Sequence, residues 1–102
     1  MVIDKISLIK LIKGQKKKLT AHGVRRIGIF GSFVNNNAHK DSDVDVLVEF
    51  KKGQKNFDNF IFLAFTLENL FGRKVEIVTP ESLNVYIAPY ILKEVEYVSL
   101  TN

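Results

Sequence analysis

The feature that most constrains this chain is the spacing between a Gly-Ser pair and two aspartates. Gly31 and Ser32 directly follow a short apolar run, and Asp43 and Asp45 come after ten further residues. From Asp43 to Phe50, apolar residues occupy every second position and acidic residues most of the others, which is typical of a strand with one buried face. Side chains two residues apart on a strand point the same way, with Cα atoms about 6.5–7 Å apart. The spacing therefore predicts two carboxylates on one face of a sheet.

Two carboxylates held this close repel each other unless a cation lies between them. Oxygen ligands suit Mg²⁺ or Mn²⁺, with water and substrate phosphates completing the coordination. A calcium-binding EF-hand loop is an alternative, because Asp41, Asp43 and Asp45 have its opening spacing. Such a loop needs Gly at its sixth position and Glu at its twelfth, where this chain has Val46 and Lys52. We therefore expect Mg²⁺ or Mn²⁺.

A third acidic candidate, Glu76, lies in another β-rich run, residues 74–78. Neighbouring residues of a strand alternate between two faces, so Glu76 would lie opposite the apolar side chains around it. If this strand lies beside residues 43–50, Glu76 joins the face that carries Asp43 and Asp45. The alternative is an exposed strand glutamate.

Gly31 and Ser32 have the composition of a phosphate-binding turn. Glycine permits close approach of the backbone, and a helix that starts here would present free N–H groups and a positive dipole end to an anion. The Ser32 hydroxyl would add a donor. A simple turn in which Ser32 caps a helix is the alternative, but the two aspartates that follow favour phosphate binding.

The bulk composition is that of an ordinary globular protein. With 102 residues, 46% of them hydrophobic and 25% charged, the chain is predicted to form one domain, residues 1–102. It has no cysteine, which excludes disulfides and thiolate metal sites, and two histidines are too few for a histidine-based zinc site. No stretch approaches the ~20 apolar residues of a membrane span, and the first residues lack the layout of a signal peptide. We therefore expect a cytoplasmic protein without a membrane partner.

Much of the basic charge behind the net charge of +4 lies early in the chain. The early basic residues are Lys5, Lys10, Lys13, Lys16, Lys17, Lys18, Arg25 and Arg26. A solvated helix face accounts for them, and an electropositive rim for triphosphate or for an acidic partner surface is the alternative. The eight phenylalanines lie mostly in apolar runs instead of among these bases, so direct nucleic-acid binding is not expected.

Hydrophobic spacing predicts alternating helices and short strands, an α/β arrangement with helices packed on a sheet. Two long helices are expected, over residues 4–21 with Asp4 as N-cap and over residues 57–71 with Gly72 at the end. The other expected elements are strands over residues 25–30, 43–50 and 74–78 and a brief helix or turn over residues 32–38. A helical region is expected from residue 80 with a break near Pro89, followed by residues 90–98 as a continued helix and then a short strand.

This combination resembles the signature of the polymerase β-type nucleotidyltransferases, and in particular the minimal nucleotidyltransferase (MNT) subfamily. The similarity covers most of the chain and is carried by Gly31-Ser32, Asp43-x-Asp45 and the runs 27–33, 42–50, 74–80 and 91–95. The resemblance implies an α/β (α+β) fold of the minimal polymerase β-like nucleotidyltransferase type, a small mixed sheet flanked by helices.

The resemblance also implies an activity, the Mg²⁺-dependent transfer of AMP from ATP to a hydroxyl group with release of pyrophosphate. Asp43 and Asp45 would hold the metal ions, and Glu76 would help to hold the one that activates the acceptor hydroxyl. Gly31 and Ser32 would orient the β and γ phosphates of the nucleotide.

Two departures from the family pattern leave other functions open. The family's third carboxylate is typically aspartate, where this chain has Glu76, and an Arg-Gly pair often follows the Gly-Ser pair, where this chain has Asn35 and Asn36. A guanidinium pairs with phosphate charge bidentately, whereas an amide supplies no charge. Lys40 or Arg26 could compensate.

Proteins of this kind are commonly encoded with a HEPN-domain ribonuclease, as the antitoxin of a toxin–antitoxin pair, and some adenylylate a tyrosine of that toxin. The resemblance therefore implies a HEPN-domain toxin as the partner and as the acceptor of AMP. The alternatives are a catalytically weak or inactive antitoxin that acts by binding alone, and a small-molecule nucleotidyltransferase.

Overall fold

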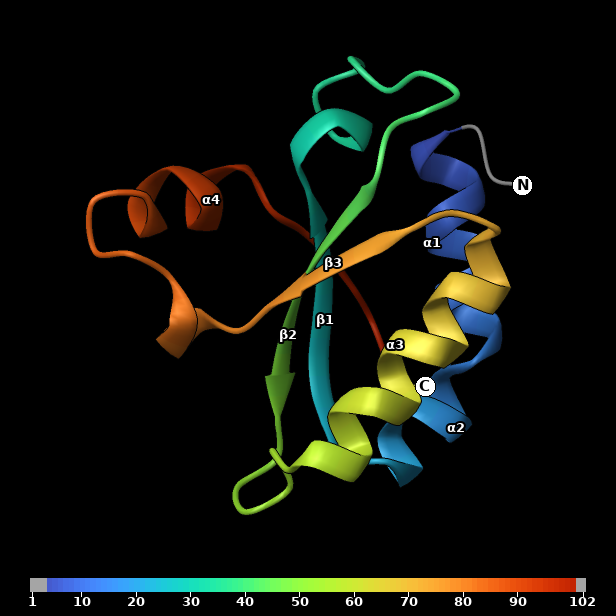
Figure 1. Cartoon of the computed structure of the whole chain (residues 1–102), viewed down its shortest axis with the longest axis vertical. Helices are drawn as coiled ribbons and strands as arrows, with labels where there is room; N and C mark the ends of the chain where they lie inside the picture. Colours follow the sequence, from blue (N-terminus) through green and yellow to red (C-terminus); the bar gives the residue numbers. More distant parts are fainter. Residues whose placement is uncertain (1–3, 101–102) are drawn as a thin grey trace.

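The computed structural model describes residues 4–100 as a four-stranded mixed sheet with helices packed against it (Figure 1). The α-helices are α1 (Lys5–Gly14), α2 (Lys16–Ala21), α3 (Phe57–Phe71) and α4 (Ala88–Glu94). The strands are β1 (Val24–Phe30), β2 (Val44–Phe50), β3 (Val75–Val78) and β4 (Glu96–Val98). Two 3₁₀ turns, η1 (Gly31–Phe33) and η2 (Pro80–Ser82), follow β1 and β3. The predicted class, a small mixed sheet flanked by helices, is confirmed.

The strands lie in the order β3-β2-β1-β4. β2 and β4 both run antiparallel to β1, whereas β3 runs parallel to β2. Parallel neighbours need a crossover connection, usually a helix, and α3 provides it between β2 and β3. The crossover brings the starts of β2 and β3 to the same end of the sheet.

Local signals in the sequence set the two ends of α3. Asn56 precedes the helix with an extended backbone, and its side chain accepts a hydrogen bond from the Asn59 amide, which is the usual N-cap arrangement. Gly72 follows the helix at φ 65°, the left-handed conformation that suits glycine at a helix C-terminus. The predicted helix over residues 57–71 is therefore confirmed at both ends.

The predicted helix over residues 4–21 is two helices in the structure. Asp4 caps the first one, as predicted, by accepting a hydrogen bond from the Ser7 amide. The break falls at Gln15, directly after Gly14, and the Gln15 amide donates to the Ile12 carbonyl in a tightened last turn. Glycine destabilises a helix interior by about 1 kcal/mol relative to alanine, which favours the break here.

The last helical region is interrupted as predicted and continues as helix after residue 90, but the interruption comes before Pro89 and not at it. Pro89 lies in the first turn of α4, where amide groups have no partner within the helix and the missing proline N–H costs nothing. Residues 83–87, which were expected to be helical, form bends and turns. The short strand β4 then follows α4, as predicted.

Helices α1, α2 and α3 cover one face of the sheet, while α4 stands apart from them (Figure 1). The apolar face of β2, predicted from its alternation, points into the core under these helices. The buried core residues are Leu8, Ile12, Leu19, Val24, Ile27, Ile29, Phe33, Val44, Val46, Val48, Leu63, Leu67, Phe71 and Val98. Asp45 and Glu49 therefore lie on the other face. Within residues 4–100, no helix is long and apolar enough to cross a membrane.

Gly28 of β1 lies in close contact with β4 and the residue before it. A Cβ at Gly28 would lie 2.6 Å from Val95 Cγ2 and 3.1 Å from the Glu96 carbonyl oxygen, so Gly28→Ala forces the two strands apart. We expect this substitution to lower the free energy of unfolding by about 1–3 kcal/mol, the usual cost of overpacking. Urea denaturation followed by circular dichroism measures the change.

Gly14→Ala is the matched control for that experiment. No atom lies within 4 Å of a Cβ built at Gly14, and Gly14 is the last residue of α1. Alanine should therefore raise the free energy of unfolding by about 0.5–1 kcal/mol. If both alanine variants were stabilised, the close packing of β4 on Gly28 would be contradicted.

Candidate active site

The carboxylates predicted from the sequence come together where β2 and β3 begin. Asp45 lies directly opposite Glu76 in the parallel register of these strands, and neighbouring strands are about 4.8 Å apart. Asp43 is exposed and immediately precedes β2, roughly 6.5–7 Å from Asp45 along the chain. The predicted pairing of residues 74–78 with residues 43–50 is confirmed.

The pKa of Asp45 shows how crowded these acidic groups are. Burial, the charge of Glu76 and a hydrogen bond with Glu76 raise this pKa from the usual 3.8 to about 6, and the charges of Asp43 and Glu94 add to the rise. Like charges disfavour the ionised carboxyl unless a cation compensates them. The start of β2 therefore favours a bound cation or, without one, a proton.

The ion pairs that form among residues 4–100 engage other carboxylates. They join Lys5 to Glu96, Lys55 to Glu81, and both Arg25 and Arg26 to Glu49. None of these basic residues neutralises Asp45 or Glu76. The negative charge at the start of β2 and β3 is therefore available to an external cation.

Gly31 brings the Gly-Ser turn against Asp45. Its φ is 77°, and a Cβ at this position would overlap Asp45 Oδ2. Only glycine accommodates both this left-handed conformation and this approach. Ser32 follows within η1, which is a single 3₁₀ turn and not the start of a longer helix. The expected helix dipole is therefore small, and the backbone donors are those of the turn itself.

Glu94, at the end of α4, is a site residue that the sequence did not reveal. Its Oε1 accepts a hydrogen bond of 2.6 Å from the Gly31 amide, and its Oε2 accepts one of 3.3 Å from Asn35 Nδ2. The contact with Gly31 spans 63 residues of sequence, so no local pattern pointed to it. A phosphate that approached this turn would have to compete with the carboxylate for the Gly31 amide.

Arg26 does not supply the positive charge that the family pattern places after the Gly-Ser pair. It forms an ion pair with Glu49, and its guanidinium carbon lies 3.8 Å from the centre of the Tyr97 ring. Arg26 is opposite Glu49 in the β1–β2 register. Glu49 is four residues after Asp45 on β2, so Arg26 lies roughly 13 Å from Asp45 along the strand direction. Lys40 is exposed in the loop that precedes β2, so it remains the other candidate for the residue that supplies positive charge to phosphate.

The chemistry of the donor set fits Mg²⁺ or Mn²⁺. Asp43, Asp45 and Glu76 offer carboxylate oxygens next to the Gly31-Ser32 turn, and hard divalent cations prefer such ligands together with phosphate and water. Among residues 4–100, however, no three acidic or histidine side chains already surround one point as metal ligands. Binding would require side-chain rotation, and the assignment of these three residues as metal ligands stays a prediction.

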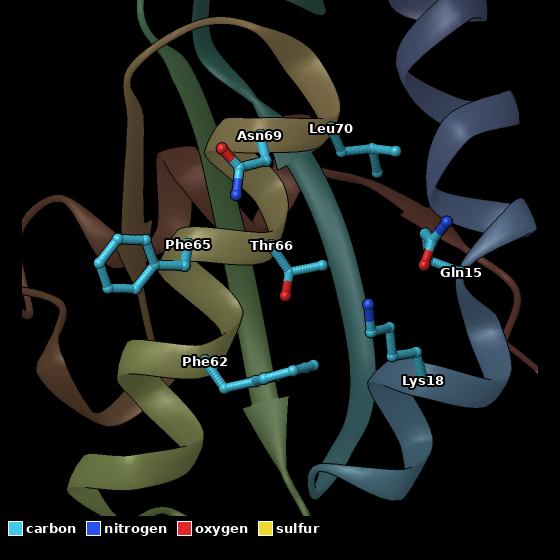
Figure 2. Close-up of a pocket in the computed structure, with 7 residues that line it drawn as sticks. All are labelled: Gln15, Lys18, Phe62, Phe65, Thr66, Asn69 and Leu70. Atoms are coloured by element: carbon cyan, nitrogen blue, oxygen red, sulfur yellow. The ribbon is translucent and has the colours of Figure 1, made fainter.

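The cavity in Figure 2 lies away from these carboxylates, between α3 and the junction of α1 with α2. Its volume is about 430 Å³, and it is lined by Gln15, Lys18, Phe62, Phe65, Thr66, Asn69 and Leu70. These helices cover the core face of the sheet, whereas Asp45 lies on the other face. The lining contains no acidic group and offers no ligand set for a divalent cation.

Replacing Asp45 by Asn removes one negative charge from the group of carboxylates that Asp45 forms with Glu76, Asp43 and Glu94. Because the pKa of Asp45 is raised to about 6 on folding, the folded chain binds more protons than the unfolded chain between about pH 4 and 6, and wild-type stability falls as the pH rises through that range. For a fully buried group, a rise in pKa of this size would lower the free energy of unfolding by roughly 3 kcal/mol above that pH range. Since Asp45 is partly exposed, we expect Asp45→Asn to be about 1 kcal/mol more stable than wild type near pH 7.5 and similar to it near pH 4. Urea denaturation in EDTA measures this.

Asp58→Asn is the control for a general effect of removing an aspartate. Asp58 is exposed in the first turn of α3, where a negative charge favours the helix N-terminus. Its replacement should therefore lower the free energy of unfolding by about 0.3–1 kcal/mol at neutral pH. A gain from Asp45→Asn that did not change with pH would contradict the charge crowding.

Comparison with known proteins places this geometry in a family. The nucleotidyltransferase domain model matches residues 8–98. The protein adenylyltransferase MntA of Thermococcus cleftensis is 44% identical over 89 residues, which cover 86% of this chain and 89% of that protein. A Methanocaldococcus jannaschii protein assigned as a protein adenylyltransferase is 38% identical over 76 residues, which cover 74% of this chain and 81% of that protein.

Solved structures show the same fold. A protein assigned as a minimal nucleotidyltransferase has a TM-score of 0.70 at 28% identity, covering 92% of this chain and 95% of that one. A chain of a toxin–antitoxin structure with AMP-PNP has a TM-score of 0.64 at 20% identity, covering 98% of this chain and 76% of that one. The match over residues 8–98 and the strand pairing of Asp45 with Glu76 confirm the prediction made from the Gly-Ser and Asp-x-Asp spacing: the chain belongs to the nucleotidyltransferase domain family.

Proposed function

We propose that this nucleotidyltransferase transfers AMP from ATP to a hydroxyl group of a partner protein. The observation that carries the proposal is the meeting of Asp45, Glu76 and the Gly31 turn, because it puts uncompensated carboxylates next to a backbone that a phosphate can approach. In the reaction, the acceptor oxygen bonds to the α-phosphorus, the bond from that phosphorus to the oxygen bridging to the β-phosphorus breaks, and pyrophosphate leaves. The acceptor hydroxyl gives up its proton to solvent water.

Each residue of the site has a separate task in this proposal. Asp43 and Asp45 would hold divalent metal ions, and Glu76 would help to hold the ion that activates the acceptor hydroxyl. Bound Mg²⁺ would supply positive charge that lowers the pKa of the acceptor hydroxyl and balances the charge of the triphosphate. Gly31 and Ser32 bind the β and γ phosphates through the backbone of the turn and the Ser32 hydroxyl, once phosphate has displaced Glu94 from the Gly31 amide.

The names of the relatives support a protein as the acceptor. The Thermococcus cleftensis protein is named a protein adenylyltransferase, and similarly folded chains come from toxin–antitoxin structures. We infer a HEPN-domain ribonuclease toxin as the partner, with this chain as its antitoxin. AMP on a hydroxyl near the active site of such a toxin would add a phosphate that repels the RNA backbone, by the electrostatics that make phosphorylation a switch.

A second function, an antitoxin that acts by binding alone, is favoured by one specific contact. Glu94 occupies the Gly31 amide, and its charge adds to that of the other carboxylates around Asp45. If Glu94 kept this place in the complex, ATP would meet a carboxylate where its own phosphates need a donor. The two functions make opposite predictions for the fate of the toxin.

Incubation of the purified complex with Mg²⁺ and ATP, followed by intact-mass spectrometry of the toxin, distinguishes them. We expect the toxin to gain the mass of one or more AMP units. The gain should be lost in the Asp43→Asn/Asp45→Asn variant, because neither amide can replace a charged metal ligand. The Asp58→Asn variant is the matched control. Asp58 is on α3, away from the candidate active site, so this variant should transfer AMP at the wild-type rate.

One outcome would reject the enzymatic function. If the toxin gained no mass with the wild-type chain, while the Asp43→Asn/Asp45→Asn variant still inhibited its ribonuclease activity fully, inhibition would come from binding alone. Replacing ATP by GTP, CTP or UTP in the same experiment tests the choice of nucleotide.

Removing the charge of Glu94 should strengthen nucleotide binding. Glu94→Gln keeps an oxygen that can accept the Gly31 N–H but no longer repels triphosphate. We expect the Kd of Mg²⁺-ATP, measured by isothermal titration calorimetry, to fall roughly three- to tenfold, which corresponds to about 0.7–1.4 kcal/mol.

Glu96→Gln is the control for the Glu94 experiment. Glu96 lies two residues further along the chain and is paired with Lys5, so its replacement should change the Kd by less than about twofold, as is usual for an exposed ion pair. A weaker affinity in Glu94→Gln would show instead that the Glu94 carboxylate helps to bind the metal-nucleotide complex.

A further inference from the structure

Residues 85–92, which we call the α4 arm, expose an unusual amount of apolar surface. The exposed fractions are 74% for Val85, 82% for Tyr86, 52% for Ile87, 76% for Tyr90 and 45% for Leu92. None of the residues of α4 is buried, and Figure 1 shows the helix and the segment before it projecting away from α1, α2 and α3. Single exposed apolar residues are ordinary, but a contiguous group of this kind marks an interaction surface.

The α4 arm is held in shape by its own backbone and not by a core. The Asn84 side chain accepts a hydrogen bond from the Tyr86 amide, and the Asn84 carbonyl accepts from the Ile87 and Ala88 amides. The arm therefore presents its side chains from an ordered turn. Preformed shape lowers the entropy lost on association.

The arm is also joined to the candidate active site. Glu94 lies two residues beyond Leu92, and its carboxylate accepts the hydrogen bond from the Gly31 amide. The Gly31 turn in turn lies against Asp45. A protein seated on the arm would thus stand beside the place where AMP is transferred.

The area that the arm offers is substantial for one partner. A tyrosine buries about 150–250 Å² when it is fully covered, so Tyr86 and Tyr90 together supply about 300–500 Å². A specific protein interface buries roughly 800 Å² on each side. The two tyrosines with their three aliphatic neighbours can therefore form the centre of such an interface, where tyrosine is a frequent hot-spot residue.

The charge around the arm is opposite to that of the chain as a whole. The chain carries a net +4, whereas residues 76–96 contain four glutamates and one lysine. Glu81 and Glu96 are paired with lysines, but Asp45 and Glu76 are not among the ion pairs formed within residues 4–100. A complementary partner surface is therefore apolar at its centre and basic at its rim.

We propose that the α4 arm is the docking surface for the protein acceptor, and that this acceptor offers an apolar recess flanked by lysine or arginine side chains next to its hydroxyl. The proposal rests on the proposed function, because it places the acceptor of AMP. Tyr86 and Tyr90 fill the recess, and in the chain without bound metal the basic rim faces the carboxylates at the start of β2 and β3.

The aromatic surface of α3 supplies a matched control. Phe65 is 67% exposed and is one of the α3 residues that line the cavity between α3 and the α1–α2 junction (Figure 2). Its exposed fraction is somewhat below the 82% of Tyr86 and the 76% of Tyr90, and it lies on the helical side of the sheet. Truncating it tests whether any exposed aromatic residue has the same effect.

The test compares the Tyr86→Ala/Tyr90→Ala variant with Phe65→Ala in binding to the purified HEPN-domain toxin, measured by biolayer interferometry. The double variant should weaken binding at least about 30-fold, as loss of interface hot spots does, while Phe65→Ala changes the Kd less than about twofold. Both variants should keep the wild-type melting temperature and the wild-type affinity for Mg²⁺-ATP. Raising the salt concentration should weaken wild-type binding, because basic and acidic groups face each other.

The outcomes separate this proposal from the proposed function. If the double variant bound the toxin with wild-type affinity and AMP transfer were intact, the proposed docking surface would be overturned and the proposed AMP-transfer activity would stand. If the double variant lost toxin binding and the wild-type chain transferred no AMP, the docking surface would be supported and the proposed AMP-transfer activity would be overturned. A loss of Mg²⁺-ATP affinity in the double variant would overturn the docking role and assign the tyrosines to the nucleotide instead. Binding that did not respond to salt would overturn the basic rim.

Discussion

The parallel pairing of β2 with β3 is the constraint on which the rest of the structure depends. Parallel neighbours require a crossover, and that crossover is α3, whose buried residues Leu63, Leu67 and Phe71 complete the core. The same pairing fixes Asp45 opposite Glu76. Because side chains alternate along a strand, a shift of one residue would send the acidic side chains of β2 into the core and its valines into water. Stability and the geometry of the site are therefore set by one register.

The acidic corner that results is unfavourable to the chain without a cation. The pKa of Asp45 is raised to about 6 by burial and by neighbouring carboxylates, so at neutral pH the folded state holds like charges close together. The Gly31 turn adds a second local constraint, a left-handed backbone packed on Asp45. Crowded charge and restricted backbone at one point are typical of a functional site, where such costs are retained because the ligand relieves them.

What the sequence could predict, and what it could not, follows from the range of each interaction. The ends of α3, the strand that carries Asp45 and the face that carries Glu76 follow from local propensity and alternation. Glu94 could not be found in this way, since its contact with Gly31 joins distant segments and depends on where α4 lies against η1. The break predicted near Pro89 lies before this residue, because proline is unfavourable inside a helix but acceptable in its first turn.

Helix α4 connects the two substrates of the proposed reaction. Its last residue, Glu94, holds the amide of the turn that would receive the triphosphate, while its exposed tyrosine, Tyr90, lies one turn earlier on the surface proposed for the acceptor. The helix is short and buries none of its residues, so few packing contacts resist its movement. A partner that shifted the helix on docking would withdraw Glu94 from Gly31 and thereby free the donor for phosphate. By linkage, ATP that displaced Glu94 would strengthen the binding of that partner by the same factor. The hydrogen bond between Glu94 and Gly31, which hinders nucleotide binding in the isolated chain, would then couple nucleotide binding to the presence of the acceptor.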